Sequence, residues 1–112
     1  MQNRRVVCTG IGVLSALGSN LESFSKNLFD GQSAIRRYPS DRFLPAALHL
    51  AAGCIPDFDP GCIDYDQKIL ARCDLFIAYA LHAAFAAIKH SGLNDNLESY
   101  DRMRAGVCFG SG

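Results

Sequence analysis

The chain has 112 residues, of which 49% are hydrophobic and 20% charged. This balance is typical of a globular domain and excludes a disordered tail. Eleven basic residues offset eleven acidic ones, so the net charge of zero gives no overall attraction to nucleic acid or to a membrane surface. Neither is expected as a partner.

The first predicted element is a short buried strand, Arg5–Thr9, followed by a tight turn at Gly10–Gly12. A strand followed by Gly-x-Gly can also cradle a dinucleotide. However, Ser15 stands where a third glycine belongs, and no second strand ends in an acidic residue at the expected offset. Close backbone packing is the favoured interpretation. The N-terminus has no signal-peptide pattern, which predicts a cytoplasmic protein.

A helix is predicted after Ser19, because Ser19 and Glu22 have the spacing of a capping box. Gly31 is expected to end this helix in a left-handed conformation. The apolar stripe of the helix consists of Leu21, Phe24 and Leu28.

The segment from Gln32 to Ile63 is irregular, with four prolines and two glycines that interrupt regular structure. A short strand is predicted within Ala51–Ile55. About thirty residues without regular structure are unusual in a compact domain. Such a stretch is often functional or packs against structure that is absent from this chain.

The second predicted helix runs from Asp66 to His90 and stops at Gly92. It is apolar almost all round, which predicts burial on most sides. A chain of this size cannot cover such a helix, so partner structure is expected. The apolar run is shorter than the roughly 20 residues that span a bilayer. Asp74, placed inside this helix, would need a partner such as Lys68 or Arg72.

Lys68 and Arg72 are four residues apart and are predicted to share a helix face. One interpretation is an ordinary solvated face. The other is a small basic docking site for an acidic partner.

The five cysteines include no C-x-x-C pair, so no metal site is predicted. No cofactor is expected either. They are expected to be free and mostly buried thiols. The histidines form no apparent constellation with them, and His82 is expected to be a satisfied core residue. The cysteines are Cys8, Cys54, Cys62, Cys73 and Cys108.

The last predicted element is a buried strand from Ala105 that leads into the turn Gly110–Gly112. Such a strand is expected to continue into more protein. The sequence therefore predicts the opening segment of a larger enzyme, with residues 1–112 as part of one domain.

Five segments carry a family resemblance, in order along the chain: Arg5–Gly18, Leu28–Ile35, Asp57–Pro60, Asp74–Ala80 and Gly106–Gly112. Together they resemble the start of the β-ketoacyl-[acyl carrier protein] synthases, the condensing enzymes of fatty acid and polyketide synthesis, and the resemblance is greatest to the elongating type. Three residues depart from the family pattern. Ala34 replaces the usual glycine, and Leu75 replaces the usual arginine, which removes any ion pair made by that arginine. Ala71 occupies a position that is often basic, so carrier docking through this face is expected to be weaker or differently arranged.

The resemblance implies a layered α/β fold of the thiolase-like type, a homodimer, and an acyl carrier protein as partner. Lys68 and Arg72 are the residues expected to contact the carrier. The resemblance also implies a cysteine nucleophile and two histidines, all located after the Gly-Ser-Gly turn. No catalytic residue is therefore assigned here, and the segment alone is expected to be inactive.

Two alternatives remain open at this stage. One is a non-catalytic homologue of the chain-length-factor type, which acts as a partner subunit. The other is a small nucleotide-binding module built on Gly10 and Gly12.

Overall fold

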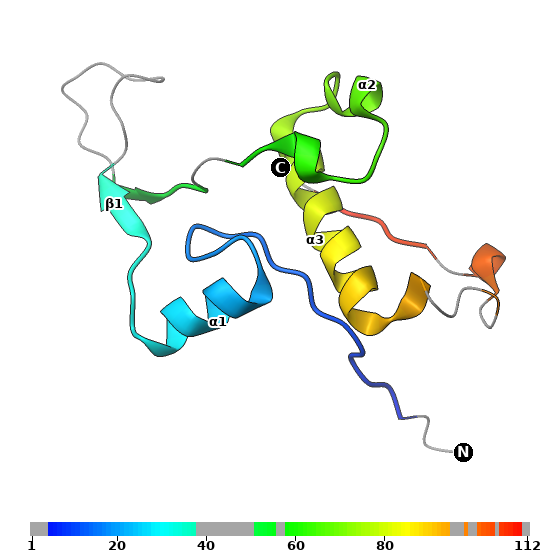
Figure 1. Cartoon of the computed structure of the whole chain (residues 1–112), viewed down its shortest axis with the longest axis horizontal. Helices are drawn as coiled ribbons and strands as arrows, with labels where there is room; N and C mark the ends of the chain where they lie inside the picture. The colour runs from blue at the N-terminus through cyan, green and yellow to red at the C-terminus, as the bar shows by residue number, and fades with distance from the viewer. Residues whose placement is uncertain are drawn as a thin grey trace. The chain divides into compact units, whose positions relative to one another are not determined.

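The computed structural model describes residues 5–37, 51–55, 58–94, 98, 101–104 and 106–110. The chain divides into two units: Val13–Asp59, and Met1–Gly12 together with Pro60–Gly112 (Figure 1). The described residues form helices as well as a small antiparallel sheet, so the chain has mixed α/β structure. Three of the four prolines (Pro39, Pro45 and Pro56), one histidine (His49) and residues Ser111–Gly112 of the predicted final turn lie outside the described residues.

The unit Val13–Asp59 contains helix α1, Leu21–Phe29. The predicted capping box of Ser19 and Glu22 is wrong by one residue, because Asn20 is the N-cap. Its Oδ1 accepts a hydrogen bond from the backbone N–H of Ser23 at 2.9 Å. Serine and asparagine are about equally good caps, so two adjacent candidates cannot be ranked from residue type alone.

The end of α1 is as predicted. Gly31 adopts a left-handed conformation with φ of +66°. Its N–H donates to the carbonyl of Leu28 at 3.1 Å, and the N–H of Gln32 donates to that of Asn27 at 2.9 Å. These two bonds satisfy carbonyls that the helix end leaves without partners.

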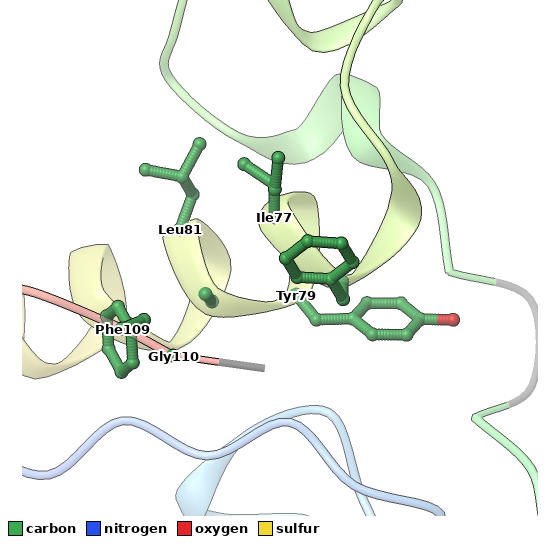
Figure 2. Close-up of a pocket in the computed structure, with 7 residues that line it drawn as sticks. Ile77, Tyr79, Leu81, Phe109 and Gly110 are labelled. Atoms are coloured by element: carbon green, nitrogen blue, oxygen red, sulfur yellow. The ribbon is translucent and has the colours of Figure 1, made fainter. Parts of the chain in front are cut away.

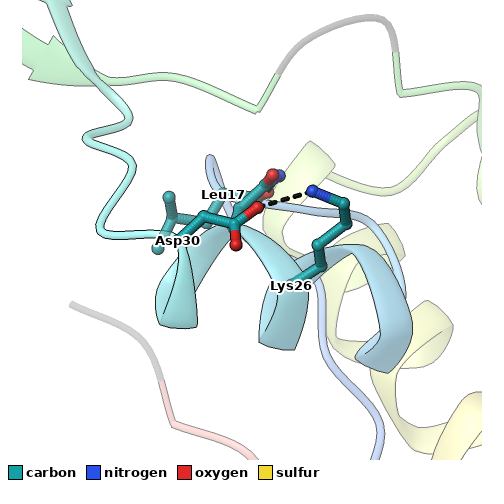
Figure 3. A network of polar contacts seen from close by, with 4 residues as sticks. Leu17, Lys26 and Asp30 are labelled. Carbon is teal, nitrogen blue, oxygen red and sulfur yellow. Dashed lines mark hydrogen bonds and ion pairs between the residues drawn. The ribbon is translucent and has the colours of Figure 1, made fainter.

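A tight turn, Ser15–Gly18, lies against α1. The N–H of Ser15 donates to the carbonyl of Gly18 at 2.9 Å, and the reverse bond measures 3.2 Å. Asn27 on α1 donates from Nδ2 to the carbonyl of Leu17 at 2.6 Å and so fixes the turn to the helix. Figure 3 shows Lys26 reaching one turn along α1 to Asp30, at 2.5 Å.

The same unit holds a two-stranded sheet. Strand β1, Ile35–Arg37, pairs antiparallel with β2, Ala51–Gly53, with Ile35 opposite Gly53. The strand predicted within Ala51–Ile55 is confirmed by β2. Strand β1 was not predicted, because three residues that include two arginines lack a clear apolar alternation.

The other unit contains η1 (Pro60–Cys62), α2 (Gln67–Leu70), α3 (Leu75–Ser91) and η3 (Arg102–Arg104). The single helix predicted over Asp66–His90 is therefore wrong, since two helices occupy that range. The predicted stop is confirmed, because Gly92 is left-handed with φ of +69°.

The break between α2 and α3 has a local cause. Asp66 caps α2 by accepting a hydrogen bond from the N–H of Lys68 at 2.8 Å. After Leu70 the bonds shorten to three-residue steps: Arg72 N–H donates to Ile69 O and Cys73 N–H to Leu70 O, both at 3.0 Å. Asp74 is then extended, with ψ of 151°, and starts α3 as its N-cap. Aspartate favours such a position.

The described residues bury little apolar surface. Three hydrophobic side chains are buried: Ile63 (4% exposed), Leu70 (6%) and Ala78 (3%). Only one of them, Ala78, belongs to α3. The prediction that this chain does not cover the long apolar helix agrees with this burial pattern.

The predicted strands at the two ends are not formed among residues 5–14 and 106–110. A strand requires a hydrogen-bonded neighbour, and the described ladder joins β1 to β2 alone. Val6 is 91% exposed and Val107 is 74% exposed, although both were expected to be buried.

Candidate functional site

The structure separates the two residues predicted to dock a carrier protein. Lys68 lies on α2, and Arg72 lies in the turn beyond Ala71, the C-cap of that helix. The expected single helix face is therefore wrong. Both side chains are exposed and remain close along the chain, so they still offer two cations next to the start of α3.

Asp74 is exposed, which overturns the expectation of a carboxylate inside an apolar helix. It occupies the N-cap of α3 and makes no side-chain capping bond. A negative charge at a helix N-terminus is favourable because it complements the helix dipole. Asp74 therefore needs neither Lys68 nor Arg72 as a partner.

The Gly10–Gly12 segment lies directly on α3. A Cβ added to Gly12 would be 1.8 Å from the carbonyl oxygen of Ala83, and one added to Gly10 would be 2.3 Å from that of Ala87. The N–H of Ile11 donates to Nδ1 of His90 at 3.0 Å. The glycines thus have the close-packing role favoured from the sequence, and this role accounts for both of them without a nucleotide.

Small residues on α3 make this approach possible. Ala83, Ala87 and Ser91 follow one another at four-residue intervals and so share one helix face. Ser91 also keeps its own hydroxyl turned inward, donating to the carbonyl of Ile88 at 2.8 Å. A Cβ added to Gly10 would lie 2.7 Å from the Cβ of Ser91, so the segment leaves little room beside that residue.

A second feature of α3 is an apolar cavity of about 410 Å³, here called the α3 groove. Figure 2 shows Ile77 and Leu81 on one side of the helix, with Phe109 and Gly110 from the C-terminal segment beside it. The hydroxyl of Tyr79 points away from the helix. The groove is lined by Phe76, Ile77, Tyr79, Ala80, Leu81, Phe109 and Gly110.

The cysteines are free, as predicted, but their predicted burial is wrong. Cys8, Cys54, Cys62 and Cys108 are exposed, and Cys73 is half-buried. Those at 8 and 108 had been assigned to strands that do not form. In the described part of the chain, no three potential metal ligands come together.

The structure brings together one pair that sequence reasoning missed. Cys62 Sγ lies 3.7 Å from Nδ1 of His82. The two residues are twenty positions apart on different elements, η1 and α3. No spacing rule joins them, since their proximity depends on how η1 packs against α3.

No helix among the described residues combines the length and apolar character needed to cross a bilayer.

Comparisons with known proteins identify the family. Residues 3–112 match the family model described as beta-ketoacyl synthase, N-terminal domain. The chain is 40% identical to 3-oxoacyl-[acyl-carrier-protein] synthase 2 of Vibrio harveyi, over the whole chain and 26% of that protein. It is 35% identical to the synthase of the same name from Coxiella burnetii, again over the whole chain and 26% of that protein.

A third relative is the putative polyketide beta-ketoacyl synthase 1 of Streptomyces halstedii, 38% identical over 97% of this chain and 25% of that protein. The chain therefore spans about a quarter of the length of the curated relatives it matches. The family predicted from its sequence motifs is confirmed: the chain belongs to the β-ketoacyl synthases and matches their N-terminal domain.

Proposed function

We propose that this chain supplies the N-terminal scaffold of a 3-oxoacyl-[acyl-carrier-protein] synthase. The observation that carries the proposal is the family match over residues 3–112. The whole enzyme would be a cytoplasmic homodimer of the thiolase-like fold. It would condense an acyl group with a malonyl group carried by acyl carrier protein.

In the proposed reaction, a cysteine thiolate takes the acyl group as a thioester. Loss of carbon dioxide from the malonyl group leaves a carbanion, which attacks the thioester carbonyl and releases the thiolate. Two histidines would stabilise the charge that develops on the thioester oxygens. None of the residues in this chain corresponds to these three, so we propose that the chain alone is inactive and acts by positioning.

The apolar side chains of α3 support a scaffold role. Leu75 is 51% exposed and Phe76 is 49% exposed, although both are large and apolar. Exposed apolar patches of this kind mark interaction surfaces. We propose that the rest of the synthase covers this face and the α3 groove.

A chimera tests this proposal. Residues 1–112 would replace the matching segment of the Vibrio harveyi synthase, which is 40% identical to them. We expect a soluble chimera that condenses acyl and malonyl groups on the carrier protein, whereas the 112-residue chain alone forms no product. An insoluble or inactive chimera, beside an active parent, would contradict the scaffold role.

The Streptomyces halstedii relative favours a second candidate, the same condensation on a polyketide chain. Replacing the segment in a polyketide synthase of that type and comparing the two chimeras would separate these candidates by relative activity. The partner-subunit alternative stays a prediction. It depends on which residue occupies the family's nucleophile position, and none of the 112 residues corresponds to that position.

Carrier docking can be tested by charge reversal in the chimera. We expect the double variant Lys68→Glu, Arg72→Glu to raise the Kd for acyl carrier protein about tenfold at low salt, because acidic carriers are attracted by complementary charge. The matched control is Arg36→Glu, Arg37→Glu, which reverses two exposed charges on β1. Equal affinities of the two variants, measured by titration calorimetry, would remove Lys68 and Arg72 from the docking surface.

The exposed apolar face predicts dye binding. The 112-residue chain is expected to enhance the fluorescence of an anilinonaphthalene dye or to self-associate, and Phe76→Glu is expected to reduce both effects. Met103→Glu is the control, since Met103 is 93% exposed on η3 but lies outside the α3 groove. A dye-negative monomer with sharp thermal unfolding would contradict the need for a covering partner.

A further inference from the structure

Cys62 is held against α3 by its neighbours in the chain. The N–H of Ile63 donates to the carbonyl of Pro60 at 3.1 Å, which closes the η1 turn, and Ile63 itself is buried. Two residues further on, the ring of Tyr65 lies 6.5 Å from that of Phe85 on α3, centroid to centroid. These contacts fix both sides of Cys62 and place its Sγ 3.7 Å from Nδ1 of His82.

This distance is within the range of a sulfur hydrogen bond, so a thiol at Cys62 can donate to Nδ1 of His82. The neutral ring then carries its own proton on Nε2. A base in contact with a thiol can take its proton at the moment the sulfur attacks an electrophile. Cys62 is exposed, so an electrophile can reach it.

A cavity of about 720 Å³ opens beside this pair. Lys89 follows His82 by seven residues, or two helical turns, and lines the same cavity as an exposed cation. Asn94 adds an amide, whereas Asp64 is the one carboxylate among the lining residues. The cavity therefore combines a thiol, a base and a cation within a partly apolar wall.

We propose that Cys62 and His82 form a thiol-exchange site that accepts small anionic disulfides. The Cys62 proton passes to His82 Nδ1 as Sγ attacks one sulfur of the disulfide. A new S–S bond joins Cys62 to that half of the disulfide, and the old S–S bond breaks. The other half leaves as a thiolate and takes the proton from His82, so no further oxidant is needed. Lys89 attracts the anionic disulfide.

The test uses the reduced 112-residue chain with oxidised glutathione as the probe, at neutral pH and without oxygen. Peptide mass mapping follows the glutathionyl group at each cysteine. We expect Cys62 to react at least about threefold faster than Cys54, which is also exposed, because thiol exchange is accelerated by deprotonation of the attacking sulfur. Equal rates at Cys62 and Cys54 would overturn the proposal, and so would a rate at Cys62 that is the same in the folded and the unfolded chain.

Three variants separate the roles. His82→Gln should lower the rate at Cys62 to that of Cys54, both with glutathione disulfide and with neutral iodoacetamide. His90→Gln, which alters the other histidine of α3, should leave that rate unchanged. Lys89→Gln should slow the reaction with the anionic disulfide alone. An unchanged rate at Cys62 in His82→Gln would disprove the role of His82 as the base. An equal loss of rate with both reagents in Lys89→Gln would disprove the preference for an anionic disulfide.

Discussion

Gly12→Ala is expected to detach the N-terminal segment from α3 and to destabilise the protein by about 2–3 kcal/mol, the upper part of the range for inserting a methyl group into a tightly packed contact. The added Cβ would lie 1.8 Å from the carbonyl oxygen of Ala83 and 2.7 Å from the amide nitrogen of Ala87. Both are backbone atoms of a helix, so neither can move aside as a flexible side chain could. The segment would have to lift away, which would also lengthen the bond from Ile11 to His90.

The free energy of unfolding should be measured by urea titration of the chimera with the Vibrio harveyi synthase, with and without Gly12→Ala. Gly106→Ala is the control, since a Cβ there would meet no atom within 4 Å. It should change stability by less than about 0.5 kcal/mol, as expected for an open surface position. If the two alanine variants unfolded at the same urea concentration, the close approach of Gly12 to α3 would be disproved.

Gly12→Ala also separates packing from nucleotide binding. Substituting a glycine that contacts a phosphate lowers the affinity for the ligand. Substituting a glycine that packs against a helix lowers the free energy of unfolding. Shortening the neighbouring side chain by Ala83→Gly should not rescue the variant, because the clash is with the carbonyl and not with the methyl group of Ala83. Rescue by that second change would mean that side chains, and not backbone, set the spacing.

The family and several helix ends could be predicted from the sequence because their signals are local. Gly31 and Gly92 end α1 and α3 in left-handed conformations, as glycine readily does. The motifs that indicated the family lie along the whole chain, and the family match covers residues 3–112. Each helix end needed only a short stretch of residues, and the family needed five short segments in the right order.

Other features depend on contacts that no short stretch specifies. The break after Leu70 carries no glycine or proline, and Asp66 and Asp74 are both good caps, so periodicity alone joined α2 and α3 into one helix. The strands predicted at the two ends do not form among the described residues, because a strand requires a hydrogen-bonded neighbour. The Cys62–His82 pair could not be predicted, because its members meet through the packing of η1 on α3.

Leu70→Ala is expected to lower the free energy of unfolding by about 2–5 kcal/mol, the usual range for removing a buried leucine side chain. Leu70 is 6% exposed at the end of α2 and is one of three buried hydrophobic residues that the described chain provides. Its neighbour Ile69 is 47% exposed, so Ile69→Ala should cost less than about 1.5 kcal/mol, in proportion to the smaller apolar area it buries.

This pair also distinguishes the observed break from the continuous helix predicted from the sequence. In one helix over 66–90, both Ile69 and Leu70 belonged to a nearly complete apolar coat, and their alanine variants would cost similar amounts. With α2 ending at Leu70, only that residue turns into the small core, whereas Ile69 stays at the surface. Urea titrations of the two variants in the chimera should therefore give clearly different midpoints. Coincident midpoints would favour the continuous helix, and with it the shared face of Lys68 and Arg72.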